Sequence, residues 1–184
     1  QKALRSMEIG LDGLDPVTTD KDELVNLLST PKPNRILAIA QAYREGIDDE
    51  EIKRLTSYDP WILNQLKEIV QAEKMVAEKE LPTNKHGLRL LKSMGFSDIQ
   101  LGRLTQSDAD AIRAIRHKNE VHPIFKRVDS CAGEFKSHTD YLYSTYEGLA
   151  GMPANDTSLA CEAVVTTREK VIILGGGPNR IGQG

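Results

Sequence analysis

The sequence predicts a mainly α fold: an irregular multi-helix domain of short capped helices, then an extended segment, then the first strand of an α/β domain. Apolar residues recur at helical spacing from residue 20 to about 120, interrupted by capping residues and glycines. After residue 121, aromatic and β-branched residues become frequent. The apolar run from Lys170 to Leu174 leads directly into glycines, which is typical of a parallel strand buried on both faces.

The first helices are predicted from their capping residues. Residues 1–8 are expected to be the tail of a helix that begins earlier in a longer chain, and Gly10 ends it. Asp20 caps a helix over 21–29, and the prolines that follow end this helix because they lack an amide hydrogen. The next helix starts at Asn34 and ends at Gly46. Its predicted buried face consists of Ile36, Ile39, Ala40 and Tyr43.

The later helices follow the same rules. Asp48 caps a short helix to about Thr56, and Asp59 caps the longest helix, with Pro60 at its first position. The predicted buried stripe of this longest helix is Ile62, Leu66, Ile69, Val70 and Val76. Thr83, Ser97 and Ser107 are the predicted caps of three more helices, and the last of these turns Ile112 and Ile115 inward and ends near Glu120.

Two stretches of the helical region resemble each other at an offset of 49 residues. Residues 46–48 match 95–97, residues 54–56 match 103–105, and Asp59 matches Asp108. Each stretch contains a glycine stop, a hydrophobic residue, a polar cap, a short helix and a second cap. This order favours an internal duplication with consecutive short helices at an angle to one another.

Composition bounds the function. Of the 184 residues, 39% are hydrophobic and 28% are charged, which is the range of folded soluble proteins rather than of disordered or membrane proteins. The net charge of −3 predicts binding neither to nucleic acid nor to a membrane. Cys131 and Cys161 lack paired spacing, so we expect free thiols in a reducing compartment. No signal peptide and no long apolar run occur, so the predicted localisation is cytoplasmic.

The end of the chain is rich in glycine. Backbone amides in the stretch Gly175 to Gly184 could hold an anion after a buried strand. The stretch departs from the dinucleotide fingerprint, because Arg180 stands where the third glycine belongs. It also departs from the phosphate-binding loop of nucleotide triphosphatases, because Gln183 replaces the required lysine. A tight strand-to-helix turn that needs glycine only for close packing is the alternative interpretation.

These motifs resemble one family over nearly the whole chain. The stretch KVIILGGGPNRIGQG resembles the opening of the second synthetase unit in the large subunit of carbamoyl phosphate synthetase. The stretch QKALRSME resembles the end of the first ATP-dependent unit. Two further stretches resemble the intervening domain, DPWILNQLKEIV and VHPIFKRVDSCAGEF, and YLYSTYE resembles its closing signature. The segment between the two units in that family is a helical oligomerisation domain.

The resemblance implies three parts. Residues 1–147 would be the helical oligomerisation domain, with 1–10 as the tail of the preceding ATP-dependent unit. Residues 148–168 would be a linker, longer than the resemblance leads us to expect, and 169–184 the start of an α/β subdomain that precedes the second ATP-grasp unit. Candidate residues near the substrate chamber or tunnel of the larger enzyme are Gly176, Gly177, Asn179, Arg180 and Gly184.

The resemblance also implies a function. The larger enzyme is a ligase that makes carbamoyl phosphate from bicarbonate, ATP and glutamine-derived ammonia for pyrimidine and arginine biosynthesis. It would use ATP with Mg or Mn, and K. This chain would have no catalytic residue, no metal and no cofactor of its own, and would space the two synthetase halves. Its expected partners are the remainder of the large subunit, the glutaminase small subunit and further copies of itself. The alternative is phosphate or nucleotide binding through Gly175–Gly184.

Other residues favour structural interpretations. The four histidines, His86, His117, His122 and His138, lack metal-ligand spacing. Cys131 is predicted to be a small buried hydrophobe rather than a nucleophile. Lys126 and Arg127 could face a tunnel or an acidic neighbour, and an ion pair with an adjoining domain is the favoured interpretation. A helix-turn-helix nucleic-acid binder would need a basic face, which the sequence lacks.

Overall fold

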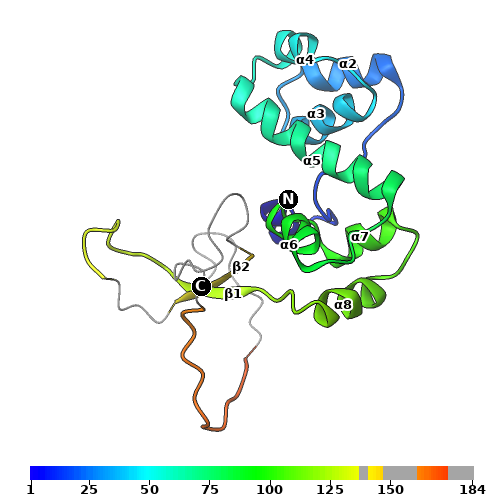
Figure 1. Cartoon of the computed structure of the whole chain (residues 1–184). Coiled ribbons are helices and arrows are strands. Elements are labelled where there is room, and N and C mark those ends of the chain that lie inside the picture. The colour runs from blue at the N-terminus through cyan, green and yellow to red at the C-terminus, as the bar shows by residue number, and fades with distance from the viewer. Residues whose placement is uncertain (137–140, 147–160, 174–184) are drawn as a thin grey trace.

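The computed structural model describes residues 1–136, 141–146 and 161–173 (Figure 1). These residues form eight helices and one two-stranded antiparallel sheet, which confirms the mainly α prediction. The helices are α1 (Lys2–Ser6), α2 (Lys21–Ser29), α3 (Arg35–Arg44), α4 (Asp49–Thr56), α5 (Pro60–Lys79), α6 (Lys85–Ser93), α7 (Asp98–Leu104) and α8 (Ala109–Lys118). The strands are β1 (Ile124–Arg127) and β2 (Leu142–Thr145).

Most of the predicted caps are confirmed by their hydrogen bonds. The carboxylates of Asp20 and Asp48 each accept from the backbone amide three residues later, both at 2.8 Å. Asp59 accepts from the Trp61 amide at 2.8 Å, and the Ser97 hydroxyl accepts from the Gln100 amide at 2.9 Å. Each side chain therefore satisfies one of the amides that a helix start leaves without an intrahelical partner.

Two predicted caps are wrong by one residue. Asn84, not Thr83, accepts from the Gly87 amide at 2.8 Å and begins α6. Asp108, not Ser107, accepts from the Ala111 amide at 2.7 Å and begins α8. In both cases two capping residues are adjacent in the sequence, and the helix starts after the second of them. Asn34 precedes α3 as predicted, although its side chain makes no capping hydrogen bond.

The buried faces are also partly different from the prediction. Helix α3 is buried around most of its circumference, including Leu37, Ala38 and Gln41, whereas Ile36 and Tyr43 are only half-buried. On α5, Ile62 is 40% exposed and Leu63 is 2% exposed, so the predicted stripe began one residue too early. The residues Leu63, Leu66 and Val70 lie at i, i+3 and i+7 and face the core formed with α2, α3 and α4.

The internal duplication is visible in the structure. Gly46 and Gly95 end α3 and α6 with positive φ angles of 77° and 91°. The following residues, Ile47 and Phe96, donate their amides back to the helix carbonyls of Ala42 and Leu91 at 2.9 and 3.2 Å. Six-to-one hydrogen bonds of this kind are typical of helix ends at glycine. The segment α3–α5 therefore recurs as α6–α8, and α5 runs from the group α2–α4 to the group α6–α8 (Figure 1).

Both copies place an equivalent residue at their centres. Ile52 of α4 and Leu101 of α7 are 49 positions apart, and each is 0% exposed. One core surrounds Ile52 and Leu24, and a second core surrounds Leu101, Phe96 and Ile112. Ile69 of α5 packs against both. The two copies therefore pack as a continuous body.

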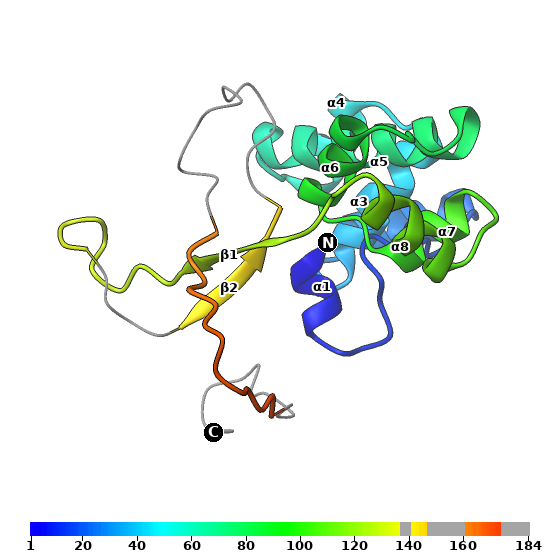
Figure 2. The ribbon, with the colours of Figure 1, turned by 60° about the horizontal axis from the view of Figure 1, so that its bottom comes forward.

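The extended segment forms a hairpin beside this body (Figure 2). Strands β1 and β2 pair antiparallel with Ile124 opposite Thr145 and Arg127 opposite Leu142. The predicted strand near the C-terminus is not formed: residues 171–173 have no strand conformation and are 83–89% exposed. An apolar strand of that kind needs neighbouring strands on its edges, and none pairs with it within the described residues. The division into domains stays a prediction.

Candidate functional site

The predicted site residues at the glycine-rich end cannot be placed. Gly176, Gly177, Asn179, Arg180 and Gly184 lie outside the described residues. The structure therefore gives no geometry for the nucleotide alternative.

Three of the four histidines, His86, His117 and His122, lie within the described residues, and His138 lies outside them. Within the described residues, no group of three His, Cys, Asp or Glu side chains is arranged to hold a metal ion. The rings of His117 and His122 stand 4.8 Å apart. Desolvation and the nearby Arg116, His122 and Arg113 lower the pKa of His117. Positive neighbours of this kind also disfavour a bound cation.

Two other sequence candidates occupy the hairpin. Cys131 is only half-buried, beside Ser130, so the prediction of a buried hydrophobe is not confirmed. The Lys126 ammonium lies 3.3 Å from the Glu162 carboxylate, which also accepts from the Arg127 amide at 2.6 Å. An ion pair of the type expected for Lys126 therefore exists, but its partner lies in the segment predicted to be a linker.

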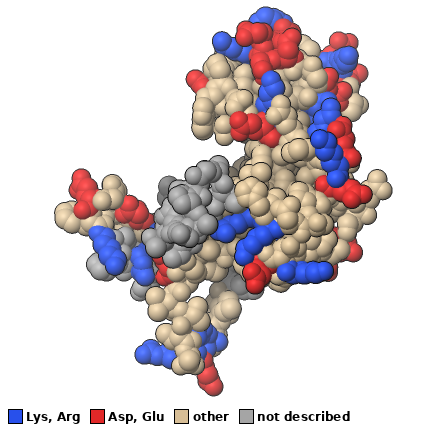
Figure 3. All heavy atoms as spheres, viewed as in Figure 1, with Lys and Arg blue, Asp and Glu red and all other residues tan. Residues whose placement is uncertain are grey.

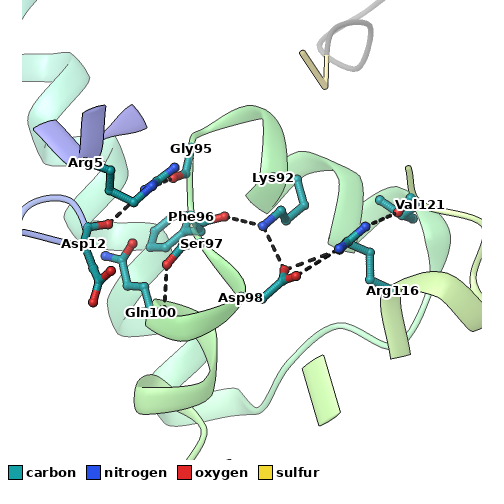
Figure 4. Close-up of polar contacts among 10 residues, drawn as sticks. All are labelled: Arg5, Asp12, Lys92, Gly95, Phe96, Ser97, Asp98, Gln100, Arg116 and Val121. Carbon is teal, nitrogen blue, oxygen red and sulfur yellow. Dashed lines mark hydrogen bonds and ion pairs between the residues drawn. The ribbon is translucent and has the colours of Figure 1, made fainter. Parts of the chain in front are cut away.

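The most organised polar group is a cluster of Lys92, Asp98 and Arg116 (Figure 4). These residues come from α6, α7 and α8, and their side chains are only 9–15% exposed. The Asp98 carboxylate accepts from Lys92 at 2.9 Å and from the Arg116 Nη2 at 2.9 Å. Lys92 also donates to the Phe96 carbonyl at 2.7 Å, and Arg116 donates to the Val121 carbonyl at 2.9 Å. The polar cluster therefore ties the three helices of the second copy to the chain that leads into β1.

The electrostatics of this cluster are strongly coupled. Desolvation lowers the pKa of Lys92, and although Asp98 opposes this, Arg116 and Arg5 lower it further. Desolvation raises the pKa of Asp98, but the hydrogen bonds from Arg116 and Lys92 outweigh it and bring that pKa below its ordinary value. One carboxylate thus serves two desolvated cations.

A second set of contacts attaches the N-terminal segment. Arg5 of α1 donates to the carbonyls of Asp12 and Gly95 at 2.9 and 2.8 Å. The Gln1 amide donates to the Met94 carbonyl at 3.0 Å. The carboxylate of Asp12 in turn pairs with Arg103 at 2.7 Å. Helix α1 and the loop after it are therefore fastened to the second copy, as Figure 4 shows for Arg5, Asp12 and Gly95.

The last strand meets the first helix at this place. The Lys2 ammonium on α1 donates to the Ser144 carbonyl of β2 at 2.6 Å. The Lys92 ammonium lies 5.5 Å from the centroid of the Tyr146 ring, within cation–π range. Figure 2 shows α1 beside the hairpin. Two lysines from different helices thus hold β2 against α1 and α6.

In this arrangement, side chains of one segment bond to carbonyls or carboxylates of another, which positions the chain segments. Sequence reasoning missed it, although one signal was present. Lys92 follows Leu88 by four residues and therefore lies on the buried face of an amphipathic helix. A lysine on such a face needs an acceptor nearby.

On the face of the described residues that Figure 3 shows, acidic and basic side chains are interspersed. Lys, Arg, Asp and Glu alternate over the helices in the view of Figure 3. Within the described residues, none of the helices has the length and apolar character that crossing a membrane requires.

Comparisons with known proteins agree on one family. Residues 1–120 match the family described as the carbamoyl-phosphate synthetase large chain, oligomerisation domain. Curated relatives named carbamoyl phosphate synthase large chain include those of Mesorhizobium japonicum, 45% identical over 199 residues, and Brucella melitensis, 44% identical over 192 residues. A third, from Haemophilus ducreyi, is 46% identical over 186 residues. Each alignment covers all of this chain and 16% of the relative, so the chain spans about one sixth of their length.

Proposed function

Since this chain belongs to the family of the carbamoyl-phosphate synthetase large-chain oligomerisation domain, we propose that it is a non-catalytic module that spaces two synthetase halves and self-associates. The observation that carries the spacing role is the junction of α1 and β2, which Lys2 and Lys92 hold side by side. A module between two units sets their separation by fixing where its first and last elements lie.

The packing supports a spacing role. The two copies of the three-helix unit form a continuous body along α5, and Arg44 ties this body to the N-terminal segment through the Leu14 carbonyl and the Glu73 carboxylate. Close-packed helices transmit position well because their interiors have few voids.

The activity belongs to the longer protein under this proposal. That protein would make carbamoyl phosphate from bicarbonate, ATP and glutamine-derived ammonia, for arginine and pyrimidine biosynthesis in the cytoplasm. ATP, Mg or Mn, and K would bind to its other domains, and a glutaminase small subunit would supply ammonia. The described part of this chain would contribute geometry alone.

Self-association can be measured directly. Light scattering after size-exclusion chromatography, over a hundredfold range of concentration, should show a mass that rises with concentration. A mass that stays monomeric over this range, in this chain and in the full-length large chain, would contradict the oligomerisation role. The isolated chain should not hydrolyse ATP.

The second candidate is phosphate or nucleotide binding through Gly175–Gly184, which the glycine-rich sequence favours. Titration calorimetry with ATP and Mg²⁺ tests it. Saturable binding at millimolar ATP that Arg180→Gln weakens would support this candidate, and heat of dilution alone would reject it.

A further inference from the structure

A cavity of about 530 Å³ opens at the junction of α1, α6 and β2. We call it the junction cavity. Lys2 and Arg5 of α1 and Lys92 of α6 line it, together with the strand residues Ser144 and Thr145. Its volume lies in the range of sites for small molecules. Among the described residues that line it, there is no Asp or Glu.

The charges around this cavity are unbalanced. Lys2 and Arg5 donate to backbone carbonyls, which carry no formal charge. Lys92 has a carboxylate partner, Asp98, but shares it with Arg116. The Asp12 carboxylate also attracts Arg5, but it pairs with Arg103 at 2.7 Å, so the cations outnumber the carboxylates that serve them. The mutual repulsion of Lys92, Arg5 and Arg116 contributes to the lowered pKa of Lys92. An added negative charge would relieve this repulsion.

Donors remain for such a charge. In the described part of the chain, the Lys2 ammonium makes one hydrogen bond, to Ser144, and has three N–H groups. Arg5 makes both of its hydrogen bonds through Nη1, which leaves its Nη2 and Nε to other acceptors. Tyr146, which bears a hydroxyl group, also lines the cavity, whereas the Ser93 hydroxyl donates to the Leu90 carbonyl at 2.7 Å.

A second cavity does not have this excess of positive charge. A cavity of about 600 Å³ beside α5 is also lined by basic residues, among them Arg44 and Lys67. There Arg44 pairs with Glu73 at 2.7 Å, and Lys67 pairs with Asp49 at 2.5 Å. The cations of that cavity are already paired with carboxylates, so that cavity should attract an anion much less strongly.

We propose that the junction cavity binds a small phosphorylated molecule, whose phosphate group contacts Lys2 and Arg5. Planar guanidinium and compact ammonium groups are the side chains that bind phosphate most often. A phosphate there would add contacts between α1 and the residues beside β2, and would therefore stabilise the junction. This goes beyond the spacing role, because it makes the geometry of the junction depend on a ligand.

The test uses inorganic phosphate as the probe and this 184-residue chain. Amide ¹H–¹⁵N spectra during a titration should show saturable shifts at Gly95, Phe96 and Thr145, which adjoin or line the cavity. The exposed Lys2 can be changed without loss of core packing. Lys2→Gln should weaken phosphate binding roughly fivefold and Lys2→Glu roughly 25-fold. The reason is that each unit of charge lost or reversed at Lys2 should reduce the binding free energy by about as much as one partly exposed ion pair contributes.

Two control variants make the assignment specific. Lys74→Gln removes a charge that is 73% exposed on α5 and should leave the affinity unchanged. Arg180→Gln should also leave it unchanged, because that residue belongs to the glycine-rich stretch. Absence of saturable shifts up to tens of millimolar phosphate would overturn the proposal. So would binding that Arg180→Gln abolishes and Lys2→Glu leaves intact, a result that would point to the glycine-rich stretch and would leave self-association unaffected.

Discussion

Replacing Asp98 by asparagine should destabilise this fold more than any exposed charge change. Asp98 is the carboxylate between Lys92 and Arg116, and the three side chains are 9–15% exposed. Asp98→Asn keeps the size of the side chain but removes its charge. The two cations then remain desolvated without a counter-ion, which is the costly way to break a buried ion pair.

The expected magnitude follows from the burial. Breaking a buried pair by removing one partner costs about 3–5 kcal/mol, and the remaining amide oxygen can still accept one hydrogen bond, so we expect about 3 kcal/mol. For a chain of this length, each kcal/mol lowers the melting temperature by about 2–4 °C, which gives a decrease of roughly 6–12 °C.

Thermal and urea denaturation followed by circular dichroism measure this change. The matched control is Glu78→Gln on α5, whose pair with Lys74 spans 3.8 Å between side chains that are 58% and 73% exposed. An exposed pair of this kind contributes less than about 0.5 kcal/mol. If Asp98→Asn costs no more than Glu78→Gln, the polar cluster is solvated in solution and does not organise the junction.

Three further predictions concern pH, capping and backbone conformation. The pKa of Asp98 in the folded protein lies below its ordinary value of 3.8. The contribution of Asp98 to stability is therefore complete above pH 3.8 and is lost as the pH falls through the lower folded pKa, so the urea midpoints of wild type and Asp98→Asn should converge in acid. Asp108→Ala should cost about 1 kcal/mol in urea denaturation and Ser107→Ala less than about 0.5 kcal/mol, and the reverse order would restore Ser107 as the cap. Gly46→Ala should cost about 1–2 kcal/mol although its Cβ meets open space, because φ is +77°; an unchanged melting temperature would show that this helix end relaxes freely.

The helices could be predicted because their limits depend on neighbouring residues in the sequence. Aspartate before a helix and glycine after it act within one turn, so Asp48 and Gly46 were sufficient to place the ends of two helices. The errors at α6 and α8 arose where two capping residues are adjacent, and only the backbone conformation decides between them. The one-residue shift from Ile62 to Leu63 has a different cause, since the buried face depends on how α5 meets α3 and α4.

The junction could not be predicted because its parts are distant in the sequence. Lys92 pairs with Asp98 of α7, is repelled by Arg116 of α8, and lies beside the ring of Tyr146, which follows β2. A pattern read along one helix gives no information on such partners. The strand expected at 170–174 is absent from residues 170–173, the part of it that the structure describes, for a related reason. A buried strand depends on the sheet around it, and the described residues offer no neighbouring strand there.

The contact between Lys2 and Ser144 joins residues 142 positions apart, whereas the helices pack mainly against their near neighbours in sequence. Closing so long a loop costs more chain entropy than any helix–helix contact, so this contact should form last during folding. The same contact should also open first, since exposed contacts between segments distant in sequence have a low free energy of local opening. Amide hydrogen exchange should therefore be faster in β2 than in α3, and β2 can separate from α1 while the helices remain folded.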